Sequence, residues 1–495
     1  MRNLKHFPVE RINNVSSGCI FILLGQMNQI YIKFKLYNTP KAVFYLFTFV
    51  MTTFCFELVA QIDTDVTIKT KALYENLKII QNSSQFLFGQ EFFNSYKFSS
   101  GSAHPDKTFS DCKEVTGVHP AVLGSDFHYY LEKDITERTI HTEAVKWAYQ
   151  QGYAITFDWH LSGKGTNTYQ YQDLTKDLVD SIVTYPKGSD RAWLYTELDK
   201  AIDIINNDLV VDAERIPIVF RPWHEMNGNW FWWGTSATSS VNYKLFFKLT
   251  VDYIKERTAS VLFCWSPNTP VNFDYYPGDD YVDVLGLDYY EIIDLELRKQ
   301  LAVIVDHAQA KNKVAIFSES GRRTSNGDFS ASYWKDTILP ALVNDPSGKS
   351  LKIAWLLTWI NASWSFSYVP HSSSSAMAKQ SFIDFENSPY TLFGNQIQNL
   401  YESWAITSLN ETPVKASTSL QLFPLPADNE LTIRLSEFNL PAKIMITDLK
   451  GQIIYVGNIF TDETTINIHE ILHPGFYLAQ ISNQSTVLSA KLIVR

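Results

Sequence analysis

The sequence predicts an α/β fold in which a (β/α)8 TIM barrel is followed by a small antiparallel β-sandwich domain. Three observations support this prediction. Eight short apolar runs alternate with amphipathic stretches between about residues 84 and 361, as in a barrel of parallel strands. Nearly every run ends in polar or aromatic side chains. Beyond residue 418 the hydrophobic period falls to two, which is typical of strands with one exposed face.

The bulk composition is that of a globular chain with more than one domain. At 495 residues the chain is longer than one ordinary domain, and a barrel uses about 250 residues or more. The formal net charge of -10 argues against nucleic acid or an anionic membrane surface as a partner. The aromatic content of 14% instead suits a neutral, ring-shaped ligand.

The segment 42–60 is apolar apart from Glu57, and it follows a basic stretch formed by Lys33, Lys35 and Lys41. A basic approach, an apolar run and a small residue before polar sequence predict an export signal that is cleaved near Ala60. The alternative is a transmembrane anchor, because the run has about the minimum length for one. Residues 1–60 are therefore assigned to the signal and an upstream extension without a fold.

Cysteine usage indicates no disulfide framework. Cys19 and Cys55 lie in the segment expected to be removed, which leaves Cys112 and Cys264 far apart in sequence. Such spacing suits neither several disulfides nor a zinc site, so the fold must rest on its hydrophobic core.

The eight apolar runs are predicted to be the barrel strands, because buried parallel strands need near-continuous hydrophobic sequence. They cover residues 86–91, 121–127, 153–160, 216–225, 261–268, 282–291, 314–320 and 353–361. Apolar residues spaced by three and four predict helices over 136–151, 191–206 and 242–257. With its flanking segments, the barrel domain is assigned to residues 61–405.

The C-terminal part is predicted to be a separate domain. Residues 406–418 form a linker, and residues 419–495 form the β-sandwich. Its alternating runs cover 431–435, 443–449, 452–457, 464–468, 476–482 and 490–495.

Two glutamates at strand ends carry the candidate chemistry. Glu225 ends the fourth run and Glu319 the seventh, and the C-terminal ends of barrel strands meet at one mouth. Hydrolysis of a glycosidic bond needs such a pair, because one carboxyl group attacks the anomeric carbon while the other protonates the leaving oxygen. A separation of about 5 to 5.5 Å would retain the configuration, and about 6.5 to 9.5 Å would invert it.

The neighbours of the two glutamates differ in the sense that this chemistry requires. The aromatic setting of Glu225 favours its protonated form, whereas Arg221 and Tyr290 favour an ionised Glu319. The structural alternative is that both carboxylates simply pair with Arg221 or Arg322.

The segment 221–234, "RPWHEMNGNWFWWG", predicts a saccharide ligand. Sugar rings stack on aromatic faces, while their hydroxyls need Asn, His or Glu partners. Neighbours along a loop point in different directions, so at least one of Trp230, Trp232 and Trp233 is expected in the core. The second histidine of a zinc motif is absent after His224, and no metal or other cofactor is expected.

Three segments resemble the signatures of β-mannanases of glycoside hydrolase family 26. They are "RPWHEMNGNWFWWG", "YYPGDDYVDVLGLDYY" (275–290) and "AIFSESG" (315–321), within a similarity that spans roughly residues 84–400 and includes "FGQE" and "PAVLGSDF". The resemblance implies an endo-acting β-1,4-mannanase that works by retaining double displacement. It further implies that Glu225 is the acid/base and Glu319 the nucleophile.

The same resemblance implies roles for surrounding residues. His224 would lie in the glycone pocket, Tyr290 would hydrogen-bond the nucleophile, and Trp359 would lie under the sugar in the cleaved subsite. The other expected substrate-binding residues are Trp159, His160, Trp230, Trp233 and Trp265, with Arg221 and Asn227 in support. After "WH" (159–160) the chain has "LSG" where the family has an Asn-Pro pair, which is a departure at the distal glycone subsites.

The C-terminal segment, from "LFPLPADNELTI" to "KLIVR", resembles the sorting domains of the type IX secretion route. This resemblance implies delivery by the secretion machinery to the cell surface or the medium. We expect the protein to be a monomer.

Two other functions stay open. One is another β-glycanase activity of the family, on mixed-linked glucan or β-1,3-xylan, and the other is a non-catalytic polysaccharide-binding protein, which would lack one of the two carboxylates.

Overall fold

The computed structural model describes residues 65–290, 294–322 and 332–404, and most of 419–494 with gaps at 425–426, 437, 439, 449–452, 470 and 484–486. The predicted export segment (42–60) and the predicted linker (406–418) lie outside the described residues. Within the described part, no helix combines the length and hydropathy needed to cross a membrane.

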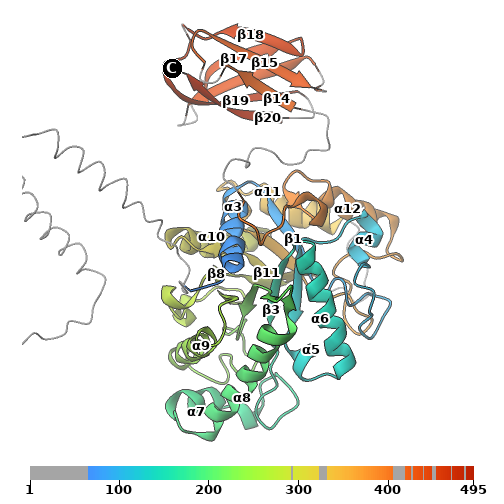
Figure 1. Cartoon of the computed structure of the whole chain (residues 1–495), viewed down its shortest axis with the longest axis vertical. Coiled ribbons are helices and arrows are strands. Elements are labelled where there is room, and N and C mark those ends of the chain that lie inside the picture. The colour runs from blue at the N-terminus through green and yellow to red at the C-terminus, as the bar shows by residue number, and fades with distance from the viewer. Residues whose placement is uncertain are drawn as a thin grey trace, which may run out of the picture. The chain divides into compact units, whose positions relative to one another are not determined.

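The described residues between 65 and 404 fold as a ring of parallel strands surrounded by helices (Figure 1). The ring consists of β1 (Phe86–Glu91), β2 (Val122–Asp126), β3 (Ala154–Asp158), β6 (Ile218–Arg221), β7 (Val261–Trp265), β8 (Val284–Leu285) with β9 (Asp288–Tyr290), β10 (Val314–Ala315) with β11 (Phe317–Gly321), and β12 (Trp355–Thr358). Neighbours pair in chain order from β1 to β8. The ring continues through β8 with β10 and β9 with β11, and β12 pairs with both β11 and β1, so it closes. Each predicted run contains one strand position of this ring, which confirms the predicted fold class.

The barrel strands are buried along their length because the interior covers one face and helices cover the other. Phe88 points outward, and its ring lies 5.5 Å from Phe382 and 5.6 Å from Phe385, both on a covering helix. The interior is crowded where polar groups point inward. A Cβ at Gly124 would lie 1.7 Å from Oε2 of Glu91, so glycine is needed there to make room for a buried carboxyl group.

The covering helices are α3 (Ile68–Asn82), α4 (Asp111–Thr116), α5 (His128–Leu131), α6 (Ile135–Gln150), α7 (Leu178–Thr184), α8 (Ser189–Asp203), α9 (Ser240–Lys255), α10 (Asp294–Ala310), α11 (Leu339–Val343) and α12 (Ala376–Glu386). Side-chain caps fix several helix starts. Asp134 accepts hydrogen bonds from the backbone of Thr136 and Glu137 at the start of α6. The three helices predicted from spacing are α6, α8 and α9, although α8 changes to a π-helical turn at Ile204–Asp208.

Short elements complete this part of the chain. They are the strands β4 (Val210–Val211), β5 (Glu214–Arg215) and β13 (Thr391–Leu392), and the helical turns η1 (Asp173–Thr175), η2 (Ile204–Asp208), η3 (Phe273–Tyr275), η4 (Asp279–Tyr281), η5 (Tyr333–Ile338), η6 (Lys349–Leu351) and η7 (Gly394–Gln396).

The C-terminal part is made of two antiparallel sheets. One sheet has the order β14 (Ser419–Phe423), β15 (Glu430–Ser436), β18 (Glu463–Asn467); the other has the order β17 (Ile453–Ile459), β16 (Ala442–Asp448), β19 (Gly475–Ser482), β20 (Val487–Val494). Inward-facing aliphatic side chains such as Ile433, Ile446 and Ile481 form its core. This agrees with the predicted sandwich and adds one strand, β14, directly after the predicted linker.

Candidate active site

Glu225 and Glu319 meet at the mouth formed by the C-terminal ends of the barrel strands. Glu319 is part of β11, and Glu225 lies just beyond β6. One carboxylate oxygen from each, together with one from Asp288, lie within 4.8 Å of one another. Both glutamates are buried, with 8% of Glu225 and 4% of Glu319 exposed. The two side chains are therefore close enough to act on one bond.

The backbone that carries Glu225 adopts an unusual conformation. Trp223 has a φ of 55° and Glu225 a φ of 52°, in the left-handed region that side chains other than glycine rarely occupy. Hydrogen bonds hold this turn in place: Glu225 N donates to Ser266 O at 2.9 Å, and Tyr243 Oη donates to Trp223 O at 3.0 Å. Strain of this kind gathers at functional sites, where the surrounding structure maintains it.

The surroundings of Glu225 favour a proton at neutral pH. Burial, followed by the charge of Glu319, raises the pKa of Glu225 to about 7. Two donors act in the opposite sense, with Trp230 Nε1 at 2.8 Å from Oε2 and Asn268 Nδ2 at 2.8 Å from Oε1. The result is a carboxyl group that can both lose and regain a proton near pH 7, as a general acid/base must.

Asn227 supports this arrangement through Asn268. Its Nδ2 donates to the backbone oxygens of Asn268 (2.7 Å) and Pro270 (2.8 Å), and its Oδ1 accepts from Asn268 N at 2.9 Å. These bonds fix the loop after β7, so Asn227 positions a donor of Glu225.

Two side chains donate hydrogen bonds to the carboxylate of Glu319. A guanidinium nitrogen of Arg221 donates to Oε1, and Tyr290 Oη donates to Oε2 at 2.9 Å. His224 Nε2 lies 3.9 Å from Oε1. An ionised carboxylate held by two donors in this way is oriented for nucleophilic attack.

Arg221 links three buried carboxylates. Its Nη1 lies 3.1 Å from both oxygens of Asp288, and its Nη2 lies 3.4 Å from Asp158 and also bonds Glu319. Burial lowers the pKa of Arg221, but the charges of Asp288, Glu319 and Asp158 outweigh this effect. Together they hold that pKa well above its usual value. Ser266 Oγ accepts a further bond at 3.0 Å. Asp158 and Asp288 thus belong to the site, although sequence reasoning did not single them out.

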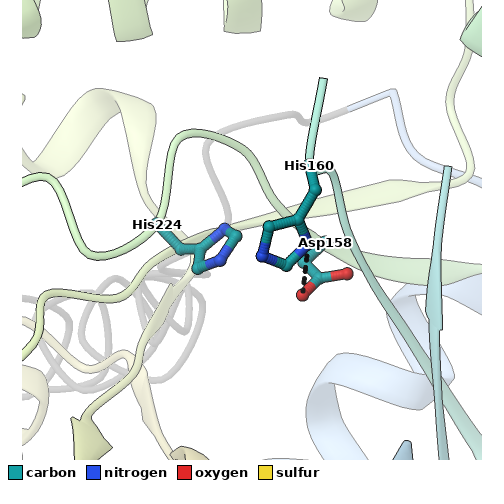
Figure 2. A group of neighbouring side chains, drawn as sticks. All are labelled: Asp158, His160 and His224. Carbon is teal, nitrogen blue, oxygen red and sulfur yellow. Dashed lines mark ion pairs between the residues drawn. The ribbon is translucent and has the colours of Figure 1, made fainter. Parts of the chain in front are cut away.

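His160 and His224 lie next to each other, with Asp158 beside His160 (Figure 2). Their ring centroids lie 4.7 Å apart with an interplanar angle of 80°. His160 Nδ1 lies 2.8 Å from Asp126 Oδ2 and 3.9 Å from Asp158 Oδ2. Burial, and then the charges of His160 and Arg221, lower the pKa of His224 well below its usual value, so that its ring is neutral. The buried Nδ1 of His224 has no hydrogen-bond partner among the described residues.

Two groups of side chains at this mouth are compact enough to hold a cation. They are Asp158, His160 and His224, and Glu225, Asp288 and Glu319. In both groups a carboxylate already pairs with Arg221, so a divalent ion would lie beside a fixed positive charge. The donor sets therefore fit a metal ion poorly, and we assign neither group as a metal centre.

Four of the expected substrate-binding side chains are partly exposed. Trp230, Tyr290, Trp359 and His160 are all half-buried. The ring of Trp359 lies 5.9 Å from that of His160, which brings the eighth and third strand positions together across the mouth.

Three expected substrate-binding tryptophans are in the core instead, which corrects the prediction for them. Trp159, Trp233 and Trp265 have no exposed surface. Trp159 stacks on Trp223 at 6.1 Å, and Trp233 Nε1 donates to the backbone oxygen of His224 at 2.8 Å. These rings shape the walls behind the site and offer no face to a sugar.

Strand alternation explains two of these three. Asp158 and His160 reach the interior network, so Trp159 between them points outward toward the helices. Ser266 bonds Arg221 inside the barrel, so its neighbour Trp265 points outward and packs against Phe273 and Tyr276.

Tyr169 and Phe231 are aromatic residues of the mouth that sequence reasoning missed. The ring of Tyr169 lies 4.7 Å from that of His160, and the ring of Phe231 lies 5.2 Å from that of His224. Their only sequence signal is their place in the two long aromatic loops after the third and fourth strands.

Comparison with known proteins identifies both domains. Residues 62–337, more than half of the chain, match Glycosyl hydrolase family 26. Residues 421–495 match a Secretion system C-terminal sorting domain, which confirms the predicted sorting domain and export by that route.

Similarity to individual proteins supports the same family assignment. A mannan endo-1,4-beta-mannosidase of Bifidobacterium adolescentis is 26% identical in an alignment of 385 residues, which covers 67% of this chain but 37% of that protein's length. One of Bacillus subtilis is 28% identical in an alignment of 272 residues, which covers 51% of this chain and 69% of that protein. The structure of a family 26 β-mannanase from Bacteroides ovatus has a TM-score of 0.60 at 28% identity, covering 68% of this chain and 98% of that one. The glycoside hydrolase class predicted from the motifs is thereby confirmed: the chain belongs to glycosyl hydrolase family 26.

Proposed function

We propose that the protein is a secreted, retaining endo-β-1,4-mannanase that cleaves internal bonds of mannan, glucomannan or galactomannan. The observation that carries this proposal is the approach of carboxylate oxygens of Glu225 and Glu319 to within 4.8 Å. Retaining glycosidases have carboxyl groups about 5 to 5.5 Å apart, whereas inverting ones need about 6.5 to 9.5 Å to admit water between them. The short separation therefore supports double displacement.

The reaction would proceed in two steps. In the first, an oxygen of Glu319 attacks the anomeric carbon, the glycosidic C–O bond breaks, and Glu225 gives its proton to the leaving oxygen. In the second, Glu225 removes a proton from a water molecule, whose oxygen attacks the same carbon and breaks the ester to Glu319. Two inversions restore the β configuration, and both side chains return to their starting protonation states.

The proposed preference for mannose rests on the polar groups of the mouth and on the relatives. Mannose carries an axial 2-hydroxyl, which needs a partner different from one that suits glucose. His224 is neutral and buried, its Nδ1 has no partner among the described residues, and its Nε2 lies 3.9 Å from Oε1 of Glu319. A hydroxyl next to the reacting carbon would meet such a group. The names of the relatives from Bifidobacterium and Bacillus, mannan endo-1,4-beta-mannosidase, support the same substrate.

A comparison of polysaccharides tests the substrate class. Reducing ends released from galactomannan, mixed-linked β-glucan and β-1,3-xylan would be measured with the same enzyme preparation. We expect release from galactomannan, with a rapid fall in viscosity because internal bonds are cut. Release from mixed-linked glucan or xylan alone would assign another β-glycanase activity, and release from none would favour a non-catalytic polysaccharide-binding role.

The domain assignment completes the proposal. Residues 1–60 would serve export, residues 61–405 would be the catalytic domain, residues 406–418 a linker, and residues 419–495 the sorting domain that engages the secretion machinery. We propose that the enzyme acts as a monomer, because both proposed catalytic residues and their partners come from one barrel.

A further inference from the structure

Trp364 is an exposed tryptophan on the loop that follows β12, with 51% of its surface open to solvent. Asn361 closes this loop at its base. Its Oδ1 accepts from the backbone of Tyr368 (2.7 Å) and Val369 (3.1 Å), and its Nδ2 donates to Asp111 at 2.9 Å. The loop that carries Trp364 therefore has a fixed, buried base.

The ring of Trp364 is also supported from the first strand position. It makes a T-shaped contact with Tyr96, with centroids 5.8 Å apart and an interplanar angle of 87°. Ser363 N donates to Ser100 O at 3.0 Å, which ties the loop after β12 to the loop after β1. Tyr96 is itself buried and donates to Glu137. Half of a large apolar ring is thus held in place while the remainder faces water.

The wall that carries Trp364 is continuous with the candidate active site. Tyr96 belongs to a buried cluster with Phe92, Ile360 and Ala362, and Trp359 packs against the same cluster. Trp364 and Trp359, which is expected under the sugar in the cleaved subsite, are therefore joined through one buried cluster.

The position of this wall assigns it to one side of the scissile bond. In the eight-position ring, β12 and β1 lie opposite β6 and β7. Glu225 and its donor Asn268 follow β6 and β7, and the acid protonates the leaving oxygen. The leaving part of the substrate then lies toward β6 and β7, and the glycone part lies along the wall of Trp359 and Trp364.

We propose that Trp364 is a stacking platform for a distal sugar residue on the glycone side of a β-1,4-linked chain. The inference rests on the proposed function, because it needs a polysaccharide longer than the cleaved subsite. A half-exposed, supported indole matches the apolar face of a neutral sugar ring, and the exposed hydroxyl-bearing neighbour Ser363 suits the hydroxyls at its rim. The platform would set a preference for longer substrates.

Oligosaccharides of different length test the platform. Trp364→Ala, Trp364→Phe and the control Tyr185→Ala, at an exposed tyrosine beyond α7, would be assayed on mannohexaose and on 4-nitrophenyl β-mannobioside. We expect Trp364→Ala to lower kcat/KM on mannohexaose about tenfold, the loss that corresponds to one ring stacking contact. The short substrate should be cleaved at the wild-type rate, Trp364→Phe should keep most activity, and Tyr185→Ala should change neither rate.

The outcomes separate this inference from the proposed function. Equal loss on both substrates would mean that Trp364 only supports the fold, and no loss on mannohexaose would mean that no sugar stacks there; either result overturns the platform. Failure of the wild type on every mannan would refute the mannanase assignment instead. The same length series, made from the glycan that the wild type does cleave, would then decide the role of Trp364.

Discussion

Tyr290 donates a hydrogen bond of 2.9 Å to Oε2 of Glu319, and Arg221 occupies the other oxygen of the same carboxylate. Glu225, within 4.8 Å, is held by donors of a different kind, an indole and an amide, and its pKa is raised to about 7. The site thus contains one carboxylate held by a guanidinium and a phenol, and one carboxyl group that exchanges its proton near neutrality. This difference between two identical side chains underlies the predictions that follow.

Removal of each glutamate should have a different effect. Glu319→Ala should lower kcat on all substrates by roughly 10⁴-fold or more, because no nucleophile remains. Glu225→Ala should lower kcat on mannan by about 10²- to 10⁴-fold, yet spare the first step for aryl mannosides whose leaving groups need no proton. Steady-state assays on both substrate types, with a burst of released aryl group for Glu225→Ala, would check this. An equal loss on both substrates would contradict the acid/base role.

The pH dependence of kcat/KM should have an alkaline limb near pH 7. The general acid must carry its proton, and the pKa of Glu225 is raised to about 7, so activity should be present below this pH and fall as the pH rises through it. Trp230→Phe removes a donor that lowers this pKa, so its alkaline limb should move to higher pH.

Trp404→Phe provides the matched control for the pH profile. The indole of Trp404 also donates a hydrogen bond, but to the backbone of Asn399 and not to the site. Its profile should coincide with that of the wild type. A limb that stays in place in Trp230→Phe, or moves to lower pH, would show that Glu225 is not the group that titrates.

Loss of Arg221 should destabilise the barrel as well as inactivate it. Arg221→Met would leave Asp158, Asp288 and Glu319 buried without their cation, at a cost of about 3 to 5 kcal/mol in the free energy of unfolding. Arg257→Met removes an exposed ion pair with Glu256 and should cost about 1 kcal/mol or less. Urea unfolding followed by tryptophan fluorescence compares the two; similar values would mean that the buried network is not the stabilising element inferred here.

Catalysis should depend on the barrel domain alone, and export should depend on the C-terminal domain. A protein ending at residue 405 should keep the kcat/KM of the full chain, because every described partner of Glu225 and Glu319 lies within the barrel. The same truncation should abolish export in a host with the secretion route, since residues 421–495 match its sorting domain. Activity assays on purified proteins and on culture fractions would measure both effects. An inactive but folded barrel would place part of the site in the C-terminal domain.

The barrel and its glutamates were predictable because their sequence signals are local. A buried parallel strand is a continuous apolar run, and its last residues lie at the end of the barrel that forms the mouth, so Glu225 and Glu319 were found from their positions. The direction of single side chains was not predictable in the same way. Both faces of such a strand are apolar, so the run gave no sign that Trp159 and Trp265 point outward.

The sequence also did not reveal residues whose role depends on partners from distant parts of the chain. Asp158 and Asp288 look like isolated acids in apolar runs, and their role becomes visible only when Arg221, from another strand, lies between them. Trp364 was missed for a similar reason, because its support by Tyr96 joins the loop after the last strand to the loop after the first.

The stereochemistry of the first product tests the central claim most directly. Hydrolysis of a mannooligosaccharide would be followed by proton NMR, with the anomer recorded before mutarotation equilibrates it. Double displacement at Glu319, with Glu225 as acid/base, predicts that the β anomer appears first. Initial release of the α anomer would mean a single displacement by water, and it would contradict the proposed roles of both glutamates.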